Sequence, residues 1–169
     1  MLTGIKDSDY KILNELEDKD LVSVCQTNKT ASKICDDQTF WFNQILTKFP
    51  KVSSETFLKN KKGRSWSEYY IEDLRNIDLT QPNKLLVDGA RNGREDWVMI
   101  ALGEGVDIHT WNDAALRWAS MGGHVEVVKI LMEAGADIHG SDYIGYDAAL
   151  RLASQNKHVE VVKLLKQYY

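Results

Sequence analysis

DAALRWASMGGHVEVVKIL, residues 113–131, returns 34 positions later as DAALRLASQNKHVEVVKLL, residues 147–165. A third and more divergent copy, NKLLVDGARNGREDWVMIALGEGVDIH, occupies residues 83–109 and aligns with residues 113–139 at an offset of 30. A repeat of this length indicates a solenoid, because one such unit cannot bury its apolar faces alone and must stack on its neighbours. We therefore expect the second half of the chain to be a stack of similar units.

The apolar residues and glycines of each copy predict two short helices. In the middle copy the first helix spans residues 114–121, with Asp113 as a candidate N-cap. The second helix spans residues 125–134 and has an apolar stripe at helical spacing. Gly135 follows it at the C′ position, where a left-handed backbone is favoured. The repeat unit is therefore predicted to be a helix pair.

These helix pairs resemble ankyrin repeats. The resemblance is carried by GHVEVVK at residues 123–129, by GADIH at residues 135–139, and by HVEVVK at residues 158–163. The Thr-Pro-Leu-His opening of that family is replaced by Ala-Ala-Leu-Arg, so Arg117 and Arg151 stand where the family has a histidine that ties neighbouring turns together. The resemblance implies an all-α solenoid that binds other proteins.

The N-terminal region predicts several short helices, since residues 7–49 contain neither glycine nor proline. One helix contains Ile12, a second is capped by Asp18 or Asp20, and a third spans residues 28–34. A fourth is capped by Asp37 and ends near Pro50. Helices of this length must pack together or on a partner to be stable in water.

Leucines and acidic residues at residues 12–29, followed by DDQTFW at residues 36–41, resemble an F-box. An F-box is a three-helix element that binds the Skp adaptor of cullin ubiquitin ligases. The combination of an F-box-like segment with ankyrin-like copies in one chain resembles the F-box/ankyrin proteins of giant DNA viruses. The resemblance implies adaptor binding by Leu13, Leu16, Leu21 and Val24.

The middle of the chain is predicted to connect the two halves. Ser65 and Glu68 have capping-box spacing, which predicts a helix from there to about Arg75. The aromatic face of this helix either packs the halves together or forms a partner site. The predicted domains are an F-box-like helical domain at 1–50, a linker with this bridging helix at 51–82, and ankyrin repeats at 83–169 (83–112, 113–146 and 147–169).

Composition places the chain among ordinary globular proteins. Its 169 residues are 43% hydrophobic and 27% charged, with a net charge of −4, which excludes a disordered chain. No apolar run reaches the roughly 20 residues of a membrane span, and no signal-peptide core follows Met1, so we expect a cytoplasmic protein, in the host cytoplasm if it is viral. The basic cluster at residues 59–64 is too narrow for a nucleic-acid interface. We expect neither a nucleic-acid partner nor a membrane partner.

The residue patterns also exclude familiar catalytic chemistry. Cys25 and Cys35 are expected to be buried thiols in a reducing compartment, since two cysteines form no disulfide framework and no CxxC or HxxxH spacing indicates zinc. The histidines recur at equivalent repeat positions, 109 with 139 and 124 with 158, so we expect them to be structural. The glycines lack phosphate-loop spacing. The sequence thus predicts a non-enzyme with no cofactor, metal or catalytic residues.

We therefore interpret the chain as an interaction adaptor that recruits a target protein, through its repeats, to a cullin ubiquitin ligase. The alternative is a plain ankyrin binding or scaffold protein whose N-terminal helices only cap the array. Trp118, matched by Leu152 in the next copy, is either a core or a binding residue. The target-binding residues implied by the ankyrin resemblance are Arg91, Asn92, Trp111, Asn112, Trp118, Met121, Tyr143, Tyr146, Gln155 and Asn156.

Overall fold

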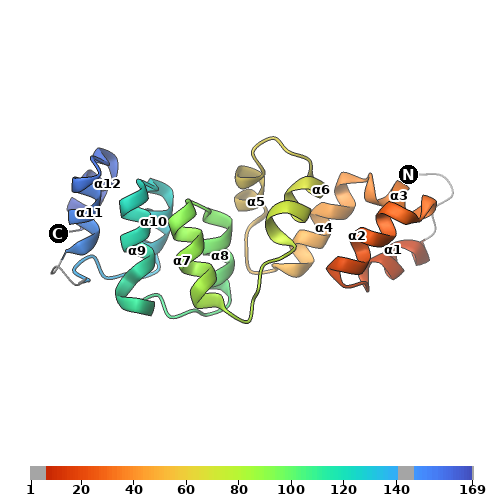
Figure 1. Cartoon of the computed structure of the whole chain (residues 1–169), viewed down its shortest axis with the longest axis horizontal. Coiled ribbons are helices and arrows are strands. Elements are labelled where there is room, and N and C mark those ends of the chain that lie inside the picture. Colours follow the sequence, from red (N-terminus) through yellow and green to blue (C-terminus); the bar gives the residue numbers. More distant parts are fainter. Residues whose placement is uncertain (1–6, 141–146, 169) are drawn as a thin grey trace. The chain divides into compact units, whose positions relative to one another are not determined.

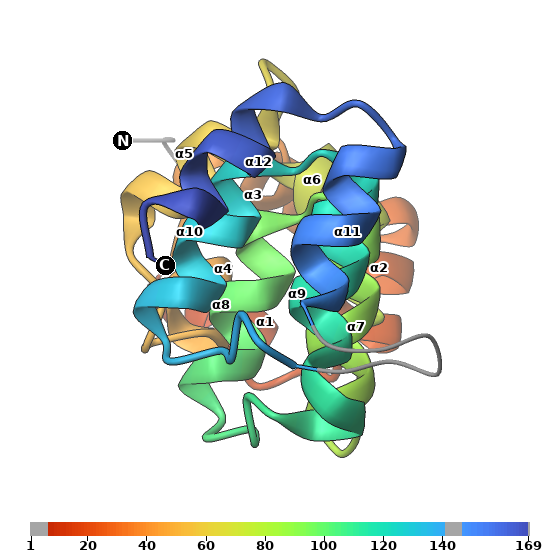
Figure 2. The same cartoon turned by 90° about the vertical axis from the view of Figure 1, so that its left-hand side faces the viewer.

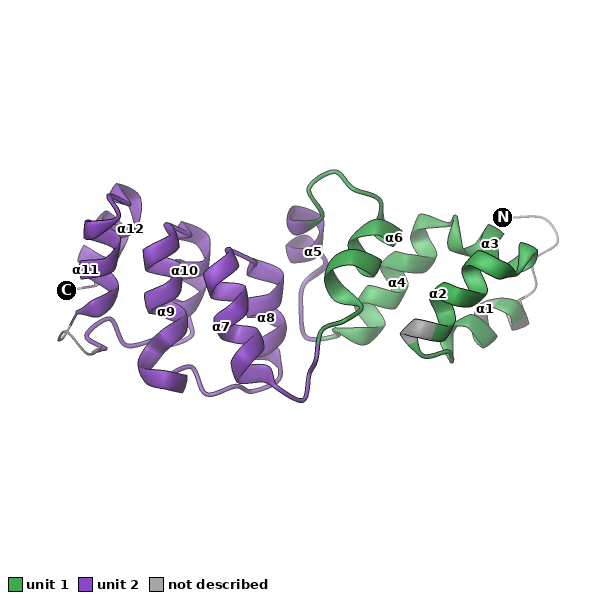
Figure 3. Ribbon diagram, in the orientation of Figure 1, with its two compact units in different colours: residues 1–50, 61–77 green, residues 51–60, 78–169 purple. Residues whose placement is uncertain are grey.

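The computed structural model describes residues 7–140 and 147–168, and every regular element within these ranges is a helix (Figure 1). The all-α prediction is therefore confirmed for the described residues. The chain forms two compact units, residues 1–50 with 61–77 and residues 51–60 with 78–169 (Figure 3). No helix in the described ranges is both long and apolar enough to cross a bilayer.

Capping residues fix where several helices of the first unit begin. The Asn28 side chain accepts hydrogen bonds from the amides of Thr30 and Ala31, at 2.9 and 3.1 Å, and so starts the third helix. Asp37 accepts from the Thr39 amide at 2.8 Å and starts the fourth, which confirms the predicted cap. The helices of this unit are α1 (Asp7–Asn14), α2 (Asp18–Thr27), α3 (Lys29–Cys35), α4 (Gln38–Lys48), α6 (Trp66–Tyr69) and the π-helical turn η1 (Tyr70–Leu74).

Two details of these helices differ from the prediction. The N-cap of α2 is Glu17, which makes no side-chain capping bond, rather than Asp18 or Asp20. The capping box at Ser65 is present, but the helix does not run on regularly to Arg75. After one turn it widens into η1, where the Arg75 amide donates to the carbonyl five residues earlier at 2.8 Å.

The core of the first unit is built around Trp41, which is 1% exposed. Its ring lies against Phe40 and Tyr70, with ring centroids 5.3 and 5.4 Å away. Its indole N–H donates to the carbonyl oxygen of Cys35 at 2.6 Å, so the polar atom of this buried ring is satisfied. Trp41 thereby ties α4 to the end of α3 and to η1.

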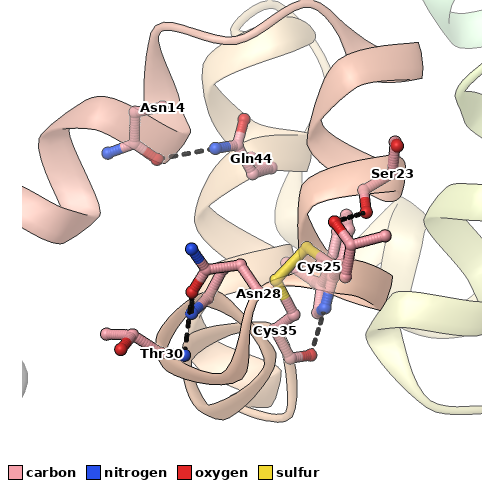
Figure 4. The surroundings of a disulfide bond; sticks show 10 residues. Asn14, Ser23, Cys25, Asn28, Thr30, Cys35 and Gln44 are labelled. Atoms are coloured by element: carbon pink, nitrogen blue, oxygen red, sulfur yellow. Dashed lines mark hydrogen bonds between the residues drawn. A yellow bond between two sulfur atoms is a disulfide. The ribbon is translucent and has the colours of Figure 1, made fainter.

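The two cysteines form a disulfide, so the prediction of two reduced thiols is wrong (Figure 4). Cys25 lies on α2 and is half-buried, while Cys35 is buried at the end of α3. The single-residue connection at Asn28 turns α3 back against α2 and brings the two Cα atoms to 5.8 Å. The cysteines therefore give no argument for a reducing compartment.

The second unit consists mainly of helix pairs stacked in two layers. The first helices of successive pairs, α7, α9 and α11, contact one another in one layer, and the second helices, α8, α10 and α12, form the other (Figure 2). This arrangement confirms the predicted stack of helix pairs. The helices are α5 (Ser54–Lys61), α7 (Pro82–Asn92), α8 (Glu95–Gly103), α9 (Thr110–Gly122), α10 (Val125–Glu133), α11 (Ala148–Gln155) and α12 (Val159–Lys166).

Residues 51–60 contact the first repeat. The Lys51 ammonium donates to the carbonyl of Gly103 at 2.7 Å, and Lys59 forms an ion pair with Glu95 at 2.9 Å. These bonds join the segment to both ends of α8. The predicted junction at 51–82 is thus divided, with residues 61–77 grouped with the first unit.

Repeat-equivalent histidines tie each helix pair to the one before it. The His124 Nε2–H donates to the carbonyl of Arg91 at 3.1 Å, and the His158 Nε2–H donates to that of Met121 at 2.9 Å. Each ring lies over a left-handed glycine. A Cβ added to Gly93 would stand 2.6 Å from the His124 ring, and a Cβ added to Gly123 would stand 2.5 Å from the His158 ring. The predicted structural role of these histidines is confirmed.

Asp113 is not the N-cap that the sequence predicted; its side chain binds the turn after α10 instead. Its carboxylate accepts from the Asp137 amide at 2.9 Å and from the His109 Nδ1–H at 3.1 Å, and it makes no capping bond to α9. It therefore links the start of α9 to the turn that follows α10. At the equivalent position of the next copy, Asp147 also makes no cap and accepts from His139 at 2.8 Å.

Candidate protein-binding surface

A pocket of about 380 Å³ lies between α9 and α11, on the layer formed by the first helices. Three of the residues that the ankyrin resemblance implies for target binding, Trp111, Trp118 and Met121, line it together. The pocket is completed by Ala114, Arg117 and Leu152. Trp118 and Met121 are half-buried, whereas Trp111 is 60% exposed. The wall is thus aromatic and apolar but open to solvent.

The exposed indole is presented by an unusual stretch of backbone. Trp111, Asn112 and Asp113 have φ angles of 52°, 55° and 53°, so three successive non-glycine residues are left-handed. Such a conformation costs about 1–2 kcal/mol per residue, although asparagine and aspartate tolerate it better than tryptophan. The surrounding structure must hold the turn in place, and backbone strain of this kind is concentrated at functional sites.

Arg117 is the side chain that holds the turn. Its Nε–H donates to the carbonyl of Asn112 at 3.1 Å, and its Nη2 donates to that of Trp111 at 2.9 Å. These two bonds join the α9 side chain to the backbone of the left-handed turn. The arginine that replaces the family's histidine therefore secures the turn that carries the exposed indole.

A second arginine covers the face of the other indole. The guanidinium carbon of Arg91, at the end of α7, lies 4.0 Å from the centroid of the Trp118 ring, which is a cation–π contact. Arg91 is exposed, so its charge is available at the edge of the pocket. Trp118 is half-buried: its ring contacts Arg91 of the preceding repeat and also lines the pocket.

The remaining predicted residues of this surface lie on or beside the same layer. Asn92 and Asn156 are exposed at the ends of α7 and α11, where their side-chain amides donate to the carbonyls of Asp88 and Leu152 at 2.7 and 2.8 Å. Gln155 is exposed on α11, and Asn112 is exposed in the left-handed turn. Tyr143 and Tyr146 lie outside the described residues.

In the first unit the residues implied for adaptor binding do not form one surface patch. Leu13 and Leu21 are only 4% and 1% exposed, while Leu16 and Val24 are half-buried. Leu13 and Val24 line a shallow hollow of about 150 Å³. Beside them lies Ile12, whose side chain is 59% exposed.

Two side chains of these surfaces were not singled out by the sequence patterns, Arg117 and Ile12. Arg117 was noted only as the replacement for the family's histidine, yet its two bonds to backbone carbonyls hold the strained turn. Its one sequence signal is the departure from the family pattern at the same place in both copies. Ile12 begins the F-box-like pattern, but its exposure was not predictable, because an amphipathic helix does not reveal which apolar residue its neighbours leave uncovered.

Comparison with known proteins agrees with the geometry of the second unit. The family model described as ankyrin repeats (3 copies) matches residues 86–169. A putative ankyrin repeat protein, L25 of Acanthamoeba polyphaga mimivirus, is 60% identical over 35 residues. That match spans 21% of this chain and 11% of the viral protein.

Proposed function

Because residues 86–169 are ankyrin repeats, a protein-interaction scaffold, we propose that the chain is a non-catalytic adaptor that binds a target protein through the α7, α9 and α11 layer. One observation carries this proposal: Trp111 is 60% exposed on a strained turn held by Arg117, next to an apolar pocket. A large exposed aromatic ring costs solubility, and tryptophan and arginine are the residues most enriched at binding hot spots.

Target binding is tested by crosslinking from the surface itself. A photo-crosslinking amino acid at position 111 should capture a discrete protein in cells that express the chain, whereas the same group at Val159 should not. Val159 is a matched control, because it is also exposed (58%) but lies on the other layer. Equal capture at both positions would argue against a specific surface on the first layer.

The more specific proposal is that the N-terminal helices bind the Skp adaptor of a cullin ubiquitin ligase. It is supported by the F-box-like pattern of residues 12–41 and by the hollow beside the exposed Ile12. Leu13 and Leu21 are buried, so in this proposal they hold the fold while Ile12, Leu16 and Val24 supply the contact surface.

Co-purification with the Skp adaptor separates this proposal from its alternative. The full chain should bind the adaptor at micromolar concentration, and Ile12→Glu should abolish binding without unfolding the chain. Leu58→Glu is the control, since Leu58 is equally exposed (57%) but lies on α5. If the wild-type chain fails to bind, the ligase proposal falls. The chain is then a plain ankyrin scaffold whose N-terminal helices only cap the array.

A further inference from the structure

The pocket between α9 and α11 has an apolar interior and a positively charged rim. Among the described residues its lining contains two indoles, a methionine and a leucine, and no acidic residue. Arg117 forms part of the wall, and the Arg91 guanidinium lies over the ring of Trp118. Residues 83–169 carry a net negative charge, so this positive rim is a local feature and does not follow from composition.

Within the described ranges neither of these two arginines has a carboxylate partner. Arg94 is paired with Asp96, and Arg64 with Asp73 and Glu72. Among the described residues, the guanidiniums of Arg91 and Arg117 contact only an aromatic ring and backbone carbonyls. Their positive charge is therefore available to an incoming anion.

The same geometry disfavours a cationic ligand. Two tryptophans side by side can form an aromatic cage for a lysine-derived ammonium. Here, however, one face of the Trp118 ring is already covered by the Arg91 guanidinium, whose carbon lies 4.0 Å from the ring centroid. A second cation in the pocket would be repelled by both arginines. The charge pattern thus selects against basic segments and in favour of acidic ones.

From these contacts we infer that the pocket binds an acidic linear segment of the target protein. A bulky apolar side chain of that segment enters between Trp111, Trp118 and Leu152, and an aspartate or glutamate within two positions of it pairs with the exposed Arg91. The volume of about 380 Å³ suits one large side chain with part of its backbone. This inference rests on the proposed function, namely that the first-helix layer binds a protein.

A displayed library of random 12-residue peptides, selected on the full chain, tests the inference. The enriched peptides should share a leucine, phenylalanine or tryptophan with an acidic residue within two positions. Enriched peptides that require Trp111 but are neutral or basic would overturn the inference and leave the proposed function standing. If no peptide is enriched, the inference also falls, and the proposed function is judged by the crosslinking at position 111.

Variants then locate the binding of one enriched peptide, measured by fluorescence anisotropy. Trp111→Ala should weaken peptide binding at least tenfold, as expected for a hot-spot aromatic residue. Because the Trp111 side chain is exposed, its removal should leave the chain folded. Arg91→Gln should weaken peptide binding about 3–10-fold and reduce its salt dependence. Lys166→Gln removes one positive charge from an exposed side chain of α12 and should leave the affinity for the peptide unchanged. Equal affinity of the Arg91 and Lys166 variants would refute the charge pairing.

Discussion

Gly123→Ala should weaken the joint between the last two repeats, and Gly135→Ala provides its matched control. Both glycines have a positive φ, 73° and 93°, so an added methyl group strains both backbones by about 1–2 kcal/mol. At Gly135 the new Cβ would meet nothing within 4 Å. At Gly123 it would stand 2.5 Å from Nδ1 of the His158 ring, so the ring must move.

Moving that ring breaks the hydrogen bond from His158 to the carbonyl of Met121, which is 2.9 Å long. A bond of this kind contributes about 1 kcal/mol. We therefore expect Gly123→Ala to lower the free energy of unfolding by about 2–3 kcal/mol and Gly135→Ala by about 1–2 kcal/mol. The φ of Gly135 is larger than that of Gly123 and suits alanine less well, so the backbone strain in the control is at least as large as at Gly123. Any extra loss of stability at Gly123 therefore comes from the histidine contact.

Urea denaturation of the full chain measures both values, and amide hydrogen exchange locates the effect. Exchange should rise over residues 147–168 in Gly123→Ala only, because stability in a repeat array depends on the interfaces between neighbours. In a His158→Ala background the extra cost of Gly123→Ala should disappear, a coupling of about 1 kcal/mol. Equal destabilisation by the two alanines, with no such coupling, would refute the account of the histidine joint.

Three further predictions concern the first unit. Reduction of the Cys25–Cys35 disulfide, which spans a sequence separation of 10, should lower the free energy of unfolding by about 2.5–3 kcal/mol, measured by urea titration with and without reductant; an unchanged midpoint would contradict it. Asp37→Ala should cost about 1 kcal/mol in the same assay, because the Thr39 amide loses its cap, while Asp37→Asn should be nearly neutral. The pKa of Glu68 should lie below that of an ordinary glutamate, because its carboxylate accepts from the Ser65 hydroxyl and amide. The contribution of this ionised carboxylate to stability is therefore complete above the ordinary glutamate pKa and is lost as the pH falls through the lowered one. NMR titration of the Glu68 side chain checks the shift, and Ser65→Ala should bring the pKa back towards its usual range.

Much of the fold could be predicted because its signals are local. Asp37 caps the helix that begins one residue later, and Gly123 takes the left-handed conformation that ends the first helix of its repeat. Both effects act within one helical turn, so the residue types are enough to predict them. The histidines at 124 and 158 could be identified as structural from their recurrence, although not the carbonyls that they bind.

The candidate site was predictable only in part. The resemblance placed Trp111, Trp118 and Met121 on one face, and the structure brings them to one pocket. The role of Arg117 was not predictable, because it depends on carbonyls that a left-handed turn exposes. No residue type signals three successive left-handed residues when the first of them is a tryptophan.

The sequence by itself determined the repeat period, the helix pairs and two of the helix caps, Asp37 and Ser65. The caps follow from side chains within one helical turn, and the period follows from the recurrence of the same residues 34 positions later. Only the tertiary structure decided that Cys25 meets Cys35 and that Leu152 closes the pocket of Trp118. Both contacts join separate helices, α2 with α3 and α9 with α11. They depend on how those helices pack, and packing is set by the shapes of all the buried side chains together.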